Sequence, residues 1–198
     1  MHDVAAAADV SPGLLYTYAA GKDALFSLVV QRAAGVDVEE FALPVENPQA
    51  GALITVVRRS VGKRMRTPAL DAALERTRAP KDVAAELSEI VAEHYDNLHE
   101  GRELIMLVER SGAEWPELAE SFTNGRRALV EKLGEYLGRR ARTGVLRATP
   151  DALVAARAII ETSAWFGNHR YGDFDGVTID ESVARATVVD LLTNAFLP

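Results

Sequence analysis

Proline placement constrains the fold of this chain more than any other sequence feature. Six of the eight prolines stand directly before a stretch whose apolar residues have helical spacing. A proline suits the first turn of an α-helix, where its missing N–H costs nothing and its fixed φ is already helical. These six are Pro12, Pro48, Pro68, Pro80, Pro116 and Pro150. No alternating strand pattern competes with them, so the sequence predicts an all-α protein.

The same pattern gives the expected helices and their caps. We expect helices at roughly 3–8, 12–18, 22–36, 48–66, 68–78, 80–100, 102–112, 116–141, 150–168 and 179–196. The expected N-caps are Ser11, Asn47, Thr67 and Thr149, and Thr178 with Glu181 fits a capping box. Residues 151–167 are apolar on nearly every side, which favours a helix covered in part by a second subunit.

Composition narrows the class of protein. The chain has 198 residues, 48% of them hydrophobic, which is enough for a sizeable core. It has no cysteine, so disulfides and metal–thiolate sites are excluded. Its apolar runs are too short to span a bilayer, and its first residues do not resemble a signal peptide, so we expect a cytoplasmic protein with no membrane partner. A net charge of −7 argues against indiscriminate nucleic-acid binding.

One segment near the front has a distinctive organisation. Residues 9–25, DVSPGLLYTYAAGKDAL, combine a turn, a short helix beginning at Pro12, a break at Gly21 and a second helix beginning at Lys22. Such a short helix depends on packing against its neighbours. The spacing is that of a helix-turn-helix, whose second helix enters the major groove of DNA. An ordinary helical corner is the alternative interpretation of the spacing alone.

Residue identity favours the first interpretation. Residues 4–30 resemble the DNA-binding segment of the TetR family of bacterial transcription regulators, through Val10, Ser11, Gly13, Leu15, Tyr16, Tyr18 and Lys22. Residues 107–122 and 144–197 resemble later parts of that family more weakly. The resemblance implies a TetR-like all-α fold, with a helix-turn-helix domain at 1–36 and a larger helical-bundle domain at 37–198 for ligand binding and dimerisation.

The resemblance also implies a set of DNA-facing residues. These are Ser11, Pro12, Gly13, Leu14, Tyr16, Thr17, Tyr18 and Lys22. Tyrosine hydroxyls and a lysine can bind phosphates, and apolar groups can touch thymine methyls. None of the eight is Arg, Asn or Gln, so specificity is expected to depend on methyl contacts and DNA shape. Residues 1–33 contain two basic and three acidic residues, a net charge of −1, which is poor for binding DNA.

The segment departs from the family pattern in three respects. Asp9 stands where a turn glycine is usual, and Ala19 stands where a phenylalanine is usual. Family members also have a further helix before the one expected at 3–8. Either the true start lies upstream, or the chain is a degenerate member that no longer binds DNA and acts as a ligand-binding or heterodimerising protein. We expect residues 1–20 to be poorly ordered or rearranged without that helix.

A second group of residues is a candidate for a small-molecule site between the later helices. They are Tyr95, Met106, Glu109, Trp115, Phe122, Trp165, Phe166 and His169. Plain core packing is the alternative for each of them. The expected ligand is an unidentified effector, because no sequence feature names its class.

Evidence for catalysis, cofactors or metals is weak. Ser60 and Lys63 match a Ser-x-x-Lys string without its companion motifs. His94 and His99 are five residues apart, which places them on different faces of a helix, and His94 is expected on a solvated surface. No phosphate loop or dinucleotide fingerprint occurs, so no cofactor is expected. We therefore expect a ligand-responsive homodimeric repressor that binds a pseudo-palindromic operator in double-stranded DNA; a small all-α enzyme is the remaining class.

Overall fold

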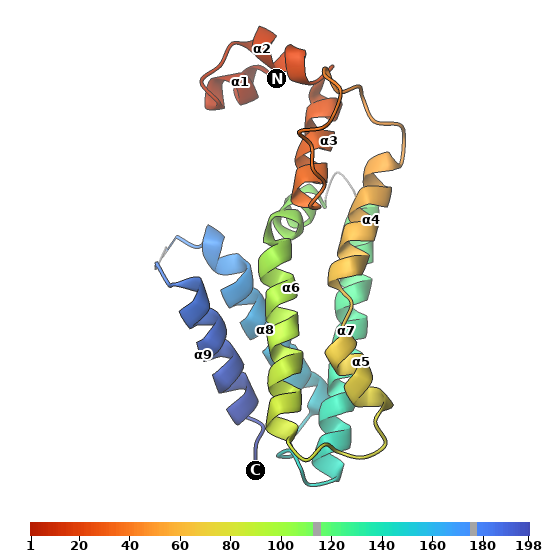
Figure 1. The fold of residues 1–198 in the computed structure, drawn as a ribbon, viewed down its shortest axis with the longest axis vertical. Coiled ribbons are helices and arrows are strands. Elements are labelled where there is room, and N and C mark those ends of the chain that lie inside the picture. The colour runs from red at the N-terminus through yellow and green to blue at the C-terminus, as the bar shows by residue number, and fades with distance from the viewer. Residues whose placement is uncertain (113–115, 175–177) are drawn as a thin grey trace.

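The protein is all-helical in the computed structural model, which describes residues 1–112, 116–174 and 178–198 (Figure 1). The helices are α1 (His2–Ala7), α2 (Pro12–Tyr18), α3 (Lys22–Ala33), α4 (Ala52–Arg64), α5 (Pro68–Glu75), α6 (Val83–Ser111), α7 (Pro116–Arg142), α8 (Ala152–Gly167), the short 3-10 helix η1 (His169–Gly172) and α9 (Glu181–Asn194). No helix in the described part of the chain is both long and apolar enough to cross a bilayer.

Helix α6 lies at the centre of the molecule. It packs against α3, α4 and α5 and also against α7, α8 and α9. The prediction of two separate helices at 80–100 and 102–112 is wrong, because these residues form a single helix of 29 residues. Gly101 does not break it. A Cβ at Gly101 would lie 2.7 Å from Cδ of Arg64, so this glycine allows the close approach of the α4 side chain.

Three helices, α4, α6 and α8, begin later than the prolines predict. Helix α4 begins at Ala52, directly after Gly51, whose φ of 79° only glycine adopts freely. Helix α6 begins at Val83, directly after Asp82, whose side chain accepts a hydrogen bond from Ala85 N at 2.9 Å. Pro48 and Pro80 therefore belong to the preceding loops. An aspartate or glycine at the N-cap position determines where these helices start.

Aspartates also replace two of the threonines predicted as caps. Asp151 caps α8 by accepting hydrogen bonds from two backbone N–H groups, and Thr149 lies outside the helix. Asp180 caps α9 in place of Thr178, so the predicted capping box with Glu181 is wrong. A carboxylate is a stronger acceptor than a hydroxyl at the positive end of a helix.

The segment between α3 and α4 forms a strap over the N-terminal unit, which consists of α1, α2 and α3. Residues 34–51 return along α3, and Val45 pairs with the end of α2 through Val45 N to Tyr18 O at 2.8 Å and Ala20 N to Val45 O at 2.9 Å. Ala19 is fully buried at this pairing. Asn47, predicted to cap the next helix, instead accepts a hydrogen bond from Ala24 N in the first turn of α3. Part of the sequence beyond residue 36 thus packs with the N-terminal unit.

Two hydrophobic clusters fill the interior. The larger joins α5, α6, α7 and α8 around residues such as Leu87 and Ile159, and Phe196 after α9 closes it. The smaller joins α3 to α4 and α6, with Val30 of α3 against Val57 and Leu104. The smaller cluster therefore connects the N-terminal unit to the bundle.

A buried ion pair fixes α6 against α7. Arg140 Nε lies 2.9 Å from Glu86 Oε1, and both side chains are about 95% buried, being 5% and 4% exposed. Arg140 also donates to the Ala73 carbonyl at 3.0 Å, and Arg76 donates to the other Glu86 oxygen at 2.7 Å. The carboxylate and the guanidinium each have more than one partner. This satisfies the condition under which a buried pair is tolerated.

We expect Arg140→Met to lower the free energy of unfolding by about 3 to 5 kcal/mol, because it leaves Glu86 buried with only Arg76 to neutralise it. Arg139→Met is the matched control. Arg139 pairs with Glu135 on the same helix and donates to the Leu74 carbonyl at 2.8 Å, and because these contacts are exposed to solvent the substitution should cost about 1 kcal/mol. Urea unfolding followed by circular dichroism measures both. Equal losses in the two variants would contradict the structural role of the buried pair.

Candidate functional site

The turn between α1 and α2 is tight. Asp9 has a positive φ of 52°, a conformation that aspartate adopts more readily than most residues. Val10 N donates to the Ala5 carbonyl, and Ser11 caps α2 by accepting a hydrogen bond from Leu14 N at 3.3 Å. The helices predicted at 3–8 and 12–18 are present, so the expected rearrangement of residues 1–20 is not observed.

The predicted DNA-facing residues lie together at the end of the molecule occupied by α1 and α2 (Figure 1). Leu14, Tyr16 and Tyr18 are 42%, 51% and 49% exposed, and no residue of α2 is buried. The remaining members, Ser11, Pro12, Gly13, Thr17 and Lys22, are exposed or partly exposed. Thr17 Oγ1 donates to the Leu14 carbonyl at 2.6 Å, which leaves its methyl group for outside contacts.

A cavity lies between α4, α6, α7 and α8. It encloses about 70 Å³, and about 770 Å³ when the open solvent at its mouth is included. Its wall is mostly apolar, with Met65, Leu98, Ile105, Phe122 and Ile160 among the lining residues. Three of the predicted ligand residues also line it, namely Glu109, Phe122 and His169.

The other predicted ligand residues lie elsewhere. Tyr95 is fully buried against α8, with its hydroxyl 3.5 Å from the Phe166 carbonyl oxygen. Trp165 and Phe166 pack edge to face, with ring centroids 4.7 Å apart, and do not line the cavity. Met106 faces an outer groove, and Trp115 lies outside the described residues. The prediction of these positions relied on their aromatic character. The face of the helix on which a residue lies decides whether its side chain reaches the cavity.

His94 is the most informative cavity residue that the sequence did not predict. We expected it on a solvated surface, but its Nε2 is buried and has no hydrogen-bond partner among the described residues. Burial lowers the pKa of His94 from 6.5 to about 4, although a hydrogen bond to the Ile160 carbonyl opposes the shift. A usable signal was present, because His94, Leu98, Gly101 and Ile105 repeat on one face of α6.

Arg64 is a second unpredicted polar residue of the cavity. Its Nε is buried without a partner, and its Nη2 donates only a long hydrogen bond of 3.4 Å to the Glu100 carbonyl. Its side chain lies over Gly101. Arg126, also in the cavity wall, is different because Glu161 neutralises it directly. Arg64 has no such carboxylate among the described residues.

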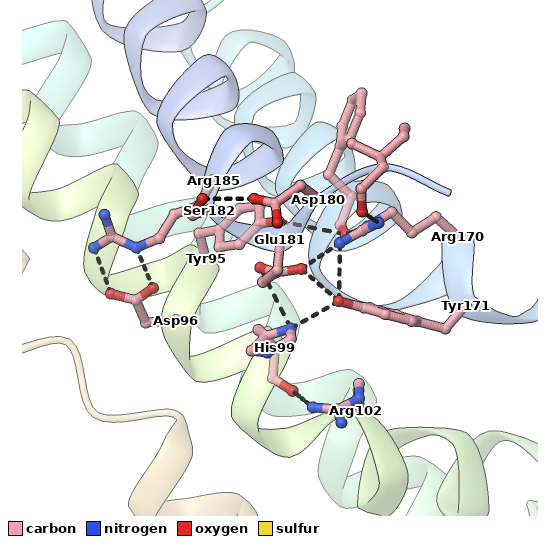
Figure 2. A network of polar contacts seen from close by, with 12 residues as sticks. Tyr95, Asp96, His99, Arg102, Arg170, Tyr171, Asp180, Glu181, Ser182 and Arg185 are labelled. Atoms are coloured by element: carbon pink, nitrogen blue, oxygen red, sulfur yellow. Dashed lines mark hydrogen bonds and ion pairs between the residues drawn. The ribbon is translucent and has the colours of Figure 1, made fainter. Parts of the chain in front are cut away.

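A polar network joins α6 to η1 and α9 on the other side of α6 (Figure 2). Tyr171 and Arg170 donate hydrogen bonds to Glu181 Oε2, and Glu181 Oε1 lies 3.4 Å from His99 Nδ1. Burial alone would raise the pKa of Glu181, but these hydrogen bonds hold it below its ordinary value. In the same network, Arg185 donates two hydrogen bonds to the Asp96 carboxylate, from Nε at 2.6 Å and from Nη2 at 2.7 Å. The network fastens α9 to the bundle.

The structure also locates the residues considered for metal binding and for catalysis. His94 faces the cavity and His99 faces the network, so the prediction that they do not share a metal-binding face is confirmed. In residues 1–112, 116–174 and 178–198 no three acidic or histidine side chains are grouped to hold a metal ion. Ser60 donates to the Ala34 carbonyl at 3.2 Å, while Lys63 is exposed.

Comparisons with known proteins give no match: no family model, no curated protein and no solved structure is significantly similar to this chain.

The His94 environment predicts a pH dependence of stability. Between pH 6.5 and about 4 the unfolded chain binds a proton at His94 that the folded chain does not, so this residue makes stability fall as the pH falls. The loss reaches up to about 3 kcal/mol near pH 4. We expect His94→Phe to flatten the pH profile in this window, whereas His2→Phe at the exposed N-terminus leaves it unchanged. Urea unfolding at a series of pH values measures the profile, and parallel curves for His94→Phe and the original protein would contradict the assignment.

Proposed function

We propose that this chain is a TetR-like transcriptional regulator, a ligand-responsive homodimeric repressor that binds a pseudo-palindromic operator. The main support is the Ser11-capped helix α2, which presents Leu14, Tyr16 and Tyr18 outward. Lys22 begins the next helix and is also exposed. A short exposed helix held by a tight turn against a second helix is the arrangement that enters a major groove.

The cavity lies where an effector can influence the DNA-facing unit. Val61, Leu104 and Phe122 line the cavity and also belong to the hydrophobic cluster on which Val30 of α3 packs. A ligand that shifts these side chains therefore acts on the helix that follows the DNA-facing segment. A coupling free energy of about 1 to 3 kcal/mol is enough for induction.

The last two helices offer a surface for dimerisation. Exposed apolar residues follow one face of each helix, with Val154 and Trp165 on α8 and Val183 and Leu191 on α9. Leu191 and Val183 are 62% and 58% exposed. Two copies that pair these faces would form a four-helix bundle around a two-fold axis. Such a dimer would place two α2 helices on successive major grooves, about 34 Å apart.

The low charge of the N-terminal unit favours one alternative. Residues 1–33 have a net charge of −1, and a protein that neutralises few phosphates gains little from counterion release. In the alternative the chain binds a small molecule, or a different subunit, without binding DNA. Selection from a random-sequence duplex library separates the two, because the alternative yields no enriched sequence.

We expect that selection to enrich sites with two inverted half-sites, centred about one helical turn apart. Lys22→Met should then weaken binding to the enriched duplex and reduce the salt dependence of log K by about one unit of slope. Arg32→Met, at the opposite end of α3, is the control and should leave the slope unchanged. Fluorescence anisotropy at several salt concentrations measures both. An identical slope for Lys22→Met and the original protein would contradict the phosphate contact.

We expect Leu191→Asp or Val154→Asp to convert the dimer to a monomer, because each places an unpaired carboxylate in an apolar interface. Val36→Asp, at an exposed apolar position beyond α3, is the control and should leave the dimer intact. Sedimentation velocity reports the state. A monomeric original protein, or dimers of unchanged stability in both α8 and α9 variants, would rule out this interface.

A further inference from the structure

The two unpartnered polar atoms of the cavity restrict what can occupy it. Arg64 Nε and His94 Nε2 are both buried without a hydrogen-bond partner in the described part of the chain. A buried polar group left unpaired is costly, and each such group in a folded protein calls for an explanation. Both residues line the same cavity, whose remaining wall is mainly apolar. A bound molecule that supplies the missing partners would account for both.

The two atoms require different partners. Arg64 is a donor with a permanent positive charge, and no carboxylate neutralises it among the described residues. His94 Nε2 has no partner among the described residues, and an imidazole nitrogen accepts or donates a hydrogen bond depending on the tautomer. The cavity thus presents a cationic donor at one place and an imidazole nitrogen without a partner at another.

Helix α6 sets the spacing between them. The Arg64 side chain lies against Gly101, which is seven residues after His94 and on nearly the same face of the helix. Seven residues of α-helix span about 10 Å. Leu98 lies between the two positions, and Ile105, Phe122 and Ile160 add apolar surface. A ligand that meets both groups must therefore be elongated and apolar in its middle.

We propose that the cavity binds an elongated apolar acid, with its carboxylate on Arg64 and a hydroxyl at its far end hydrogen-bonded to His94 Nε2. This inference rests on the proposed function only in taking the ligand as the effector. Glu109 Oε2 and His169 Nδ1 lie 3.9 Å apart, and both residues line the cavity as well as the outer groove.

Three probes with the same eight-carbon chain test the proposal: 8-hydroxyoctanoate, octanoate without the hydroxyl, and 1,8-octanediol without the charge. Isothermal titration calorimetry on the protein alone should give the tightest binding for 8-hydroxyoctanoate. Each missing group should weaken binding by about tenfold, since each leaves a buried partner unsatisfied. Equal affinity for all three probes, or no binding of 8-hydroxyoctanoate, would overturn the proposal.

Variants assign each preference to its residue. Arg64→Met should abolish the preference over the diol, and Arg64→Lys should retain part of it because the charge remains. His94→Phe should abolish the preference over octanoate, and His94→Gln should retain part of it through its side-chain amide. Arg59→Met removes the same charge from an exposed position of α4 and should change neither preference. The assignment would be contradicted if Arg64→Met lost the preference over octanoate and His94→Phe lost the preference over the diol. Loss of either preference in Arg59→Met would also contradict it.

The outcome is separable from that of the proposed function. Probe binding is measured without DNA, so the expected preferences would support the ligand class even if no duplex were enriched. If the protein binds a selected duplex but does not distinguish the probes, the regulator proposal stands and the ligand class is wrong. Release of the duplex by 8-hydroxyoctanoate, and not by the diol, would support both.

Discussion

The need to cover one long central helix on every side determines most of this structure. Most of the stability of a helix in a protein comes from packing rather than from its own hydrogen bonds, so the 29 residues of α6 depend on the helices around them. Its first turns are held by the buried Glu86–Arg140 pair, which fixes the position of α6 along α7. Its middle is anchored on one side by the Asp96–Arg185 ion pair to α9. The opposite side faces the cavity, so this part of the cavity wall is held in place by the rest of the bundle.

The sequence predicted the all-α class and most helices because prolines and apolar periodicity act locally. It failed where distant residues decide. Gly101 is a helix breaker by local propensity, yet here it admits the Arg64 side chain from another helix. Asn47 has the sequence position of a local cap, yet it caps a helix 23 residues earlier in the chain. Neither contact leaves a signal in its own neighbourhood.

The candidate sites divide in the same way. The exposed face of α2 could be predicted because every member belongs to one short segment whose cap, Ser11, is also local. The cavity could not, because its residues come from four helices whose relative rotation is set by packing. Aromatic residues such as Tyr95 and Trp165 were plausible choices by chemistry alone. Each lies on a helix that contributes to the cavity, but on a different face.

The strap gives the cavity a second route to the DNA-facing unit under the proposed function. Val30, in the second half of α3, packs on the cluster that shares side chains with the cavity. The first turn of α3 is capped by Asn47, on the strap that leads directly into α4. Val45 of the same strap is paired to the last residue of α2. Because Arg64 lies at the end of α4, a ligand that displaces this helix would act on α3 at both ends and on α2 through the backbone, which favours movement of the unit as a rigid body.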